Sequence, residues 1–133
     1  MASLDTNVLV RFLVQDDAVQ GEAAAALIRS SVRTGSALFV PVTVTLELEW
    51  VLRSAFGFDK SAVIRALFGL LASFELDFES EGAVEAALAQ YEQSPADFSD
   101  CMHAALARRA NQQPWWTFDK AASRLVGAKL LAA

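Results

Sequence analysis

The sequence contains very little cysteine and histidine. Cys101 and His103 are the single representatives of their residue types among 133 residues. One cysteine excludes a disulfide within the chain and fits a reducing, cytoplasmic setting. One cysteine and one histidine also nearly exclude zinc sites, which need several sulfur or nitrogen ligands. Metal chemistry in this chain would therefore depend on oxygen ligands.

Membrane and secretion signals are also lacking. No apolar run approaches the roughly 20 residues of a membrane-spanning helix. The start of the chain, MASLDTNVLVRF, has no basic region and reaches an acid at Asp5, so it does not resemble a signal peptide. We therefore expect no membrane partner and a cytoplasmic protein.

The sequence also lacks an excess of positive charge. Sixteen Asp and Glu oppose eleven Lys and Arg, which gives a formal net charge of −5. A protein that binds nucleic acid through a broad basic surface would not have this charge. The charge does not argue against a metal-dependent nuclease, because cations bound inside an acidic cluster offset it locally.

The chain is rich in hydrophobic residues, which make up 54% and include nine Phe and three Trp. This is enough for one core, and no linker or repeat interrupts the sequence, so one domain over residues 1–133 is expected. Short apolar runs alternate with longer helical stretches, which predicts βαβ units with a parallel sheet and helices on both faces. Strands are expected at Ser3–Asp5, Ala37–Val40, Phe74–Phe78, Trp115–Phe118 and Lys129–Leu131, with helices at 8–14, 16–31, 43–55, 59–71, 80–91 and 97–110.

Two acids follow predicted strands. Asp5 ends the first strand and Asp119 follows Trp115–Phe118, and each precedes a helix. Either acid alone is equally well explained as a helix N-cap. The carboxyl edge of a parallel sheet is, however, where ligands bind. If the two strands are neighbours, the two carboxylates converge at that edge.

Three further acids lie on predicted helices. Asp97 and Asp100 share a face at a helix start, where the helix dipole favours negative charge. The helix is largely apolar around Asp100, and an acid there is costly unless it is paired or bound to a cation. Glu47 borders a stripe marked by Val44 and Val51, so we expect Glu47 to face inward and Glu49 to face outward. Clustered carboxylates suit Mg²⁺, with Mn²⁺ as a plausible substitute.

Four segments make the sequence recognisable: LDTNVLVRFLVQDD, VTVTLELEWVLR, ADFSDCMHAALARRA and TFDKAA. Their order and spacing over nearly the whole chain resemble the PIN-domain ribonucleases, and among these the VapC-like toxins of toxin–antitoxin pairs. The resemblance implies a three-layer α/β/α sandwich whose central parallel sheet has four to five strands. It also implies hydrolysis of RNA phosphodiester bonds with Mg²⁺, a homodimer, and a small antitoxin protein as partner.

The resemblance also implies roles for individual residues. The acidic catalytic centre would consist of Asp5, Glu47, Asp100 and Asp119. Asp5 and Asp100 would be the main Mg²⁺ ligands, and Asp97 would be an accessory ligand. The groups that orient the carboxylates would be Thr6, Asn7 and Thr117.

Several residues depart from the family pattern or leave alternatives open. We interpret His103 as a histidine of the surface or core edge rather than as a catalytic one. For Trp115 and Trp116, a place in the core or an interface is favoured over stacking on RNA bases. Four basic residues are candidates for a rim that contacts phosphate: Arg11, Arg53, Arg108 and Lys120. For most of them, solvation or a salt bridge to an acid is the favoured role.

Two other functions compete with the nuclease. A PIN-like binding module with little turnover would not depend on its carboxylates. A phosphatase of the haloacid-dehalogenase type also places an Asp after the first strand, but it needs a second Asp two residues on, where this chain has Asn7. Replacing Asp5 by Asn separates the first alternative from the nuclease, and a trapped aspartyl-phosphate at Asp5 would support the second.

Overall fold

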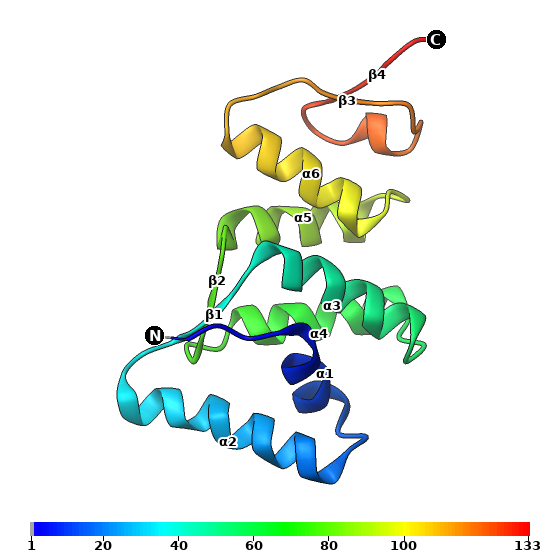
Figure 1. The fold of residues 1–133 in the computed structure, drawn as a ribbon. Coiled ribbons are helices and arrows are strands. Elements are labelled where there is room, and N and C mark those ends of the chain that lie inside the picture. The colour runs from blue at the N-terminus through cyan, green and yellow to red at the C-terminus, as the bar shows by residue number, and fades with distance from the viewer. Residues whose placement is uncertain (1) are drawn as a thin grey trace. The chain divides into compact units, whose positions relative to one another are not determined.

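The structure, a computed structural model, describes residues 2–133, so Met1 of the predicted domain lies outside the described residues. The chain forms two compact units: the N-terminal unit ends at Glu79, and the C-terminal unit is Ser80–Ala133. Each unit has its own sheet and helices (Figure 1). The expectation of one domain over residues 1–133 stays a prediction.

The N-terminal unit has a parallel sheet around β1 (Leu38–Val40). One neighbour is β2 (Leu76–Phe78), paired in register from Leu38↔Leu76 to Val40↔Phe78. The other neighbour is the segment before the first helix, which makes a parallel bridge from Ser3 to Phe39. The helices of this unit are α1 (Thr6–Val14), α2 (Ala18–Thr34), α3 (Val42–Ser54) and α4 (Lys60–Leu71).

Short polar side chains determine where these helices begin. The Asp17 carboxylate accepts a hydrogen bond from the Gln20 amide at the start of α2, and Asp59 does the same for Ala62 at the start of α4. Helix α3 follows Pro41, which has no side-chain donor or acceptor to offer. Glu79 replaces that cap, because its Oε1 accepts a hydrogen bond of 2.8 Å from the Val42 amide.

The C-terminal unit pairs two helices and a second parallel sheet. Helix α5 (Glu81–Gln93) packs on α6 (Phe98–Arg109), and strand β3 (Trp115–Thr117) pairs with β4 (Ala128–Leu130). A short 3₁₀ helix, η1 (Ala122–Arg124), connects the strands. Phe98 is fully buried and packs at 5.5 Å between ring centroids against Tyr91, which ties α6 to α5.

The predicted fold class is confirmed: the chain is α/β, its strands are parallel, and six α-helices accompany them in the described residues. This is compatible with an α/β sandwich. The five expected strand segments are present in order, but they are distributed over two sheets, three segments in one and two in the other. Within residues 2–133 no helix has the length and apolar character needed to cross a membrane.

Gly127 offers a test of the turn that leads into β4. Its φ is +83°, a value that L-residues with a side chain rarely adopt, and an added Cβ would lie 2.2 Å from Gln113 Nε2. We expect Gly127→Ala to lower the free energy of unfolding by about 1–2 kcal/mol, as measured by urea denaturation. Gly69→Ala is the control, because a Cβ at this helical position meets nothing within 4 Å. A Gly127→Ala variant as stable as wild type would contradict the strained turn.

Candidate functional site

Thr6 joins two acids that lie far apart in the sequence. Its amide donates a hydrogen bond of 2.8 Å to Asp5 Oδ1, and its hydroxyl donates to Glu47 Oε1 on α3. Thr6 itself is buried, at 3% exposure, whereas both carboxylates are open to solvent. The N-terminal unit therefore connects both acids to Thr6, Asp5 through the amide and Glu47 through the hydroxyl.

The expected orientations of Glu47 and Glu49 are wrong. Glu49 is buried at 4% exposure, and Glu47 is exposed. The buried stripe of α3 runs through Thr45, Glu49 and Leu52 rather than through Val51, so the inward face is rotated relative to the expected one. The buried charge of Glu49 is compensated by an ion pair of 2.8 Å with Arg53. The i,i+4 spacing of this Glu–Arg pair was the available signal.

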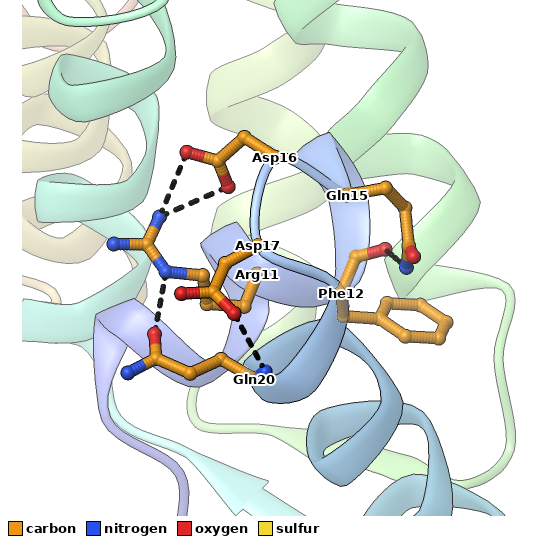
Figure 2. A network of polar contacts seen from close by, with 6 residues as sticks. All are labelled: Arg11, Phe12, Gln15, Asp16, Asp17 and Gln20. Carbon is orange, nitrogen blue, oxygen red and sulfur yellow. Dashed lines mark hydrogen bonds and ion pairs between the residues drawn. The ribbon is translucent and has the colours of Figure 1, made fainter.

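Asn7 and Arg11 lie on α1, beyond Thr6. Both residues line a pocket of about 310 Å³ between α1 and α2, whose other walls are mainly apolar. Figure 2 shows how Arg11 is held: its Nη1 is 3.1 Å from Asp16 Oδ1, and its Nε donates to Gln20 Oε1 at 2.7 Å. For Arg11, as for Arg53, the favoured expectation of a salt bridge is confirmed.

The other three predicted acids belong to the C-terminal unit. Asp97 is the N-cap residue of α6, Asp100 is in the first turn, and Asp119 follows β3. Burial raises the pKa of Asp100 above its ordinary value of 3.8, the negative charges of Asp97 and Asp119 raise it further, and His103 acts in the opposite direction. Asp100 is half-buried, whereas Asp97 and Asp119 are exposed. Asp97 and Asp119 are thus close enough to Asp100 to disfavour its ionised form.

Thr117 and the next turn fix the position of Asp119. The Thr117 hydroxyl accepts a hydrogen bond of 3.1 Å from the Asp119 amide. Asp119 Oδ1 in turn accepts one of 2.9 Å from the Ala122 amide at η1, so the acid also has the capping role considered from sequence. The arrangement orients Asp119 through its backbone and leaves its second carboxylate oxygen without a hydrogen-bond donor from residues 2–133.

His103 and the two tryptophans occupy different environments. His103 is exposed on α6, which confirms a surface position, and its ring centroid lies 5.8 Å from that of Trp115. Trp115 is half-buried in this contact. Trp116 is 51% exposed, so a place in the core is wrong for this residue.

The donor chemistry of these residues fits a hard divalent cation. Carboxylate oxygens are the ligands that Mg²⁺ and Mn²⁺ accept, and a cation would relieve the repulsion that raises the pKa of Asp100. Within the part of the chain that the structure describes, no group of three or more His, Cys, Asp or Glu side chains is close enough to hold a metal.

The sequence matches the PIN domain over residues 2–127. The chain belongs to the PIN domain family. The PIN fold is generally a nuclease fold that acts on RNA or DNA, commonly with divalent metals. The match runs through both units and includes all of the predicted site residues. No curated protein matches the chain.

Proposed function

We propose that this PIN protein is a Mg²⁺-dependent endoribonuclease that hydrolyses RNA phosphodiester bonds. The observation that carries the proposal is the half-buried Asp100, which burial and the nearby charges of Asp97 and Asp119 disfavour in its ionised form, in a chain of a nuclease family. Like charges are kept together at a cost in stability, and a site that binds a cation repays that cost. Mn²⁺ would substitute for Mg²⁺ because both accept carboxylate oxygens.

Asp5 and Asp100, assisted by Asp97, would hold the metal, while Glu47 and Asp119 would complete the catalytic set. When bound, the metal would neutralise the scissile phosphate and activate a water. Thr6 would keep Glu47 and Asp5 in a fixed relation through its two hydrogen bonds, and Thr117 would hold the Asp119 backbone. Asn7 would contribute beside Asp5.

We further propose that the protein is the toxin of a VapBC-type pair, acting in the cytoplasm as a homodimer. Its small antitoxin partner would neutralise the acidic centre. The supports are the motif resemblance set out above and the single cysteine, which fits a reducing compartment. A short companion reading frame beside the gene would agree with this assignment, and activity that no neighbouring product suppresses would count against it.

Cleavage of total RNA by the purified full chain tests the nuclease directly. We expect fragments with Mg²⁺ or Mn²⁺ and none with EDTA, because the carboxylates alone cannot stabilise the charge of the attacked phosphate. Glu85→Gln is the matched control, since Glu85 is an exposed acid of α5 outside the predicted site. Cleavage that persists in EDTA would overturn the metal mechanism, and intact RNA under all conditions would favour the binding module.

Thr6 should act as a positioning residue. Thr6→Val keeps the shape of the side chain but removes the donor to Glu47, so we expect kcat to fall by about 10–100-fold with little change in KM. Thr6→Ser keeps the hydroxyl and should retain most of the activity. If both variants lose activity equally, packing of the buried side chain, and not the hydrogen bond, would be the explanation.

A further inference from the structure

The positive charges of this acidic chain are concentrated after Asp100. Residues 101–133 contain five basic residues and one acid, a net charge of +4, whereas residues 1–100 carry −9. The basic residues of this segment are Arg108, Arg109, Lys120, Arg124 and Lys129, and all five are exposed. A polyanion that approaches Asp100 and Asp119 therefore finds its complementary charge in the C-terminal segment.

Two aromatic side chains in the same segment are open to solvent. Trp116 is 51% exposed and Phe118 is 67% exposed, and Asp119 follows directly. Trp115, between Pro114 and Trp116, instead packs on His103 of α6. Two exposed large aromatics separated by a single residue of the chain are informative because most proteins bury such side chains.

A cation lies over the exposed tryptophan. Lys129 is the register partner of Trp116 across the β3–β4 ladder, and its Nζ is 5.5 Å from the centroid of the Trp116 ring. Successive side chains of a strand point to opposite faces, so Trp116 and Lys129 lie on the face opposite to Trp115. The ring and the ammonium group therefore form one surface, which we call the Trp116–Lys129 surface.

We propose that the Trp116–Lys129 surface, extended by Phe118, binds single-stranded RNA. Bases stack on the two exposed rings, and Lys129 contacts a phosphate, which is the combination that single strands need. The inference rests on the proposed function, and it adds a binding surface to it: the surface ends at Phe118, which directly precedes Asp119 in the chain. Unpaired bases are required, because base pairs in a duplex do not expose their ring faces for stacking.

A second copy of the chain is a less suitable occupant of this surface. A two-fold interface contains the same patch from both subunits, so it would bring together two sets of the exposed cations of this segment. Like charges across an interface oppose association. The +4 charge of the segment thus favours a polyanion over a copy of itself.

Binding can be measured without cleavage in the Asp100→Asn background. A labelled, unstructured RNA of about 12 nucleotides is titrated with the full chain in Mg²⁺, and fluorescence anisotropy gives the Kd. We expect Trp116→Ala to raise the Kd about tenfold and Trp116→Phe to stay close to the parent. Trp50→Ala is the matched control, because Trp50 is 58% exposed but lies on α3 of the other unit, and it should not change the Kd.

Lys129→Ala should weaken binding less and reduce the slope of log Kd against log salt by about one. An RNA duplex of the same sequence should bind more weakly than the single strand. The Kd of a single-stranded DNA of the same sequence shows whether the ribose contributes to binding. Unchanged RNA affinity in Trp116→Ala overturns the proposal, and a simultaneous change of oligomeric state would assign the surface to a protein contact. If Trp116→Ala loses RNA binding but the wild type never cleaves RNA, the binding surface remains supported and the nuclease proposal fails.

Discussion

Replacing Asp100 by Asn is expected to abolish RNA cleavage and, at the same time, to stabilise the folded protein. The amide keeps the shape of the side chain but loses its charge and much of its affinity for Mg²⁺. Because the metal supplies several kcal/mol of transition-state stabilisation, we expect activity to fall about a thousandfold or more. Glu85→Gln, which removes the same charge elsewhere in the unit, should leave both quantities near their wild-type values.

The stabilisation by Asp100→Asn follows from the raised pKa of Asp100. Between its ordinary value of 3.8 and the raised value, the folded protein binds more protons at this site than the unfolded chain does. Stability due to this group therefore falls as pH rises through that window, and above it the ionised carboxylate destabilises the fold. The Asn variant should melt at a higher temperature than wild type at pH 7, and the difference should vanish below about pH 4.

Thermal unfolding at several pH values, without metal, compares the melting temperatures of wild type and Asp100→Asn. Saturating Mg²⁺ should then raise the melting temperature of wild type more than that of Asp100→Asn, since only the wild type regains the lost stability by binding the cation. An Asn variant that melts below wild type at pH 7 would show that Asp100 makes a structural contact rather than a strained functional one.

Glu47→Gln and Glu49→Gln are expected to have opposite consequences, although the two residues lie two positions apart on α3. Glu47 is exposed and bonded to Thr6, so its amide variant should fold normally and lose about 100-fold or more in kcat. Glu49 is buried and paired with Arg53, so Glu49→Gln should lower the free energy of unfolding by about 1–3 kcal/mol. The specific activity of the folded fraction of Glu49→Gln should remain close to that of wild type.

Denaturant unfolding and single-turnover cleavage on the same preparations separate these effects. Each variant serves as the control for the other, because both remove one negative charge from the same helix. An inactive but stable Glu49→Gln, together with an active Glu47→Gln, would reverse the assignment of the two acids.

The orientation of α3 shows where prediction from sequence failed. Val44 and Val51 predict an apolar stripe along α3, but Val51 is only half-buried, while Thr45 and Glu49 are buried. A helix can bury polar groups when partners exist: the Thr45 hydroxyl donates to the Pro41 carbonyl at 3.4 Å, and Glu49 pairs with Arg53. Those partners depend on tertiary packing, which hydrophobic periodicity does not contain.

Other features could be read from local chemistry. The order of helices and strands follows from short apolar runs and from capping acids such as Asp17 and Asp59, whose hydrogen bonds the structure contains. The grouping of Asp97 with Asp100 follows from helical spacing. The hydrogen bond between Thr6 and Glu47 joins residues 41 positions apart, and no local pattern specifies such a contact. Which acids share one centre is likewise a question of long-range packing.

Metal binding by the full chain is the most direct test of the proposed metal ligands Asp5 and Asp100. Calorimetric titration with Mn²⁺ is compared for wild type, Asp5→Asn, Asp100→Asn and the double variant. We expect each single substitution to weaken the same binding event at least tenfold, about 1.4 kcal/mol, and the double variant to lose little more. If Asp5→Asn instead leaves the Mn²⁺ binding of wild type unchanged while Asp100→Asn removes it, Asp5 is not a metal ligand, and the proposed ligand set is contradicted.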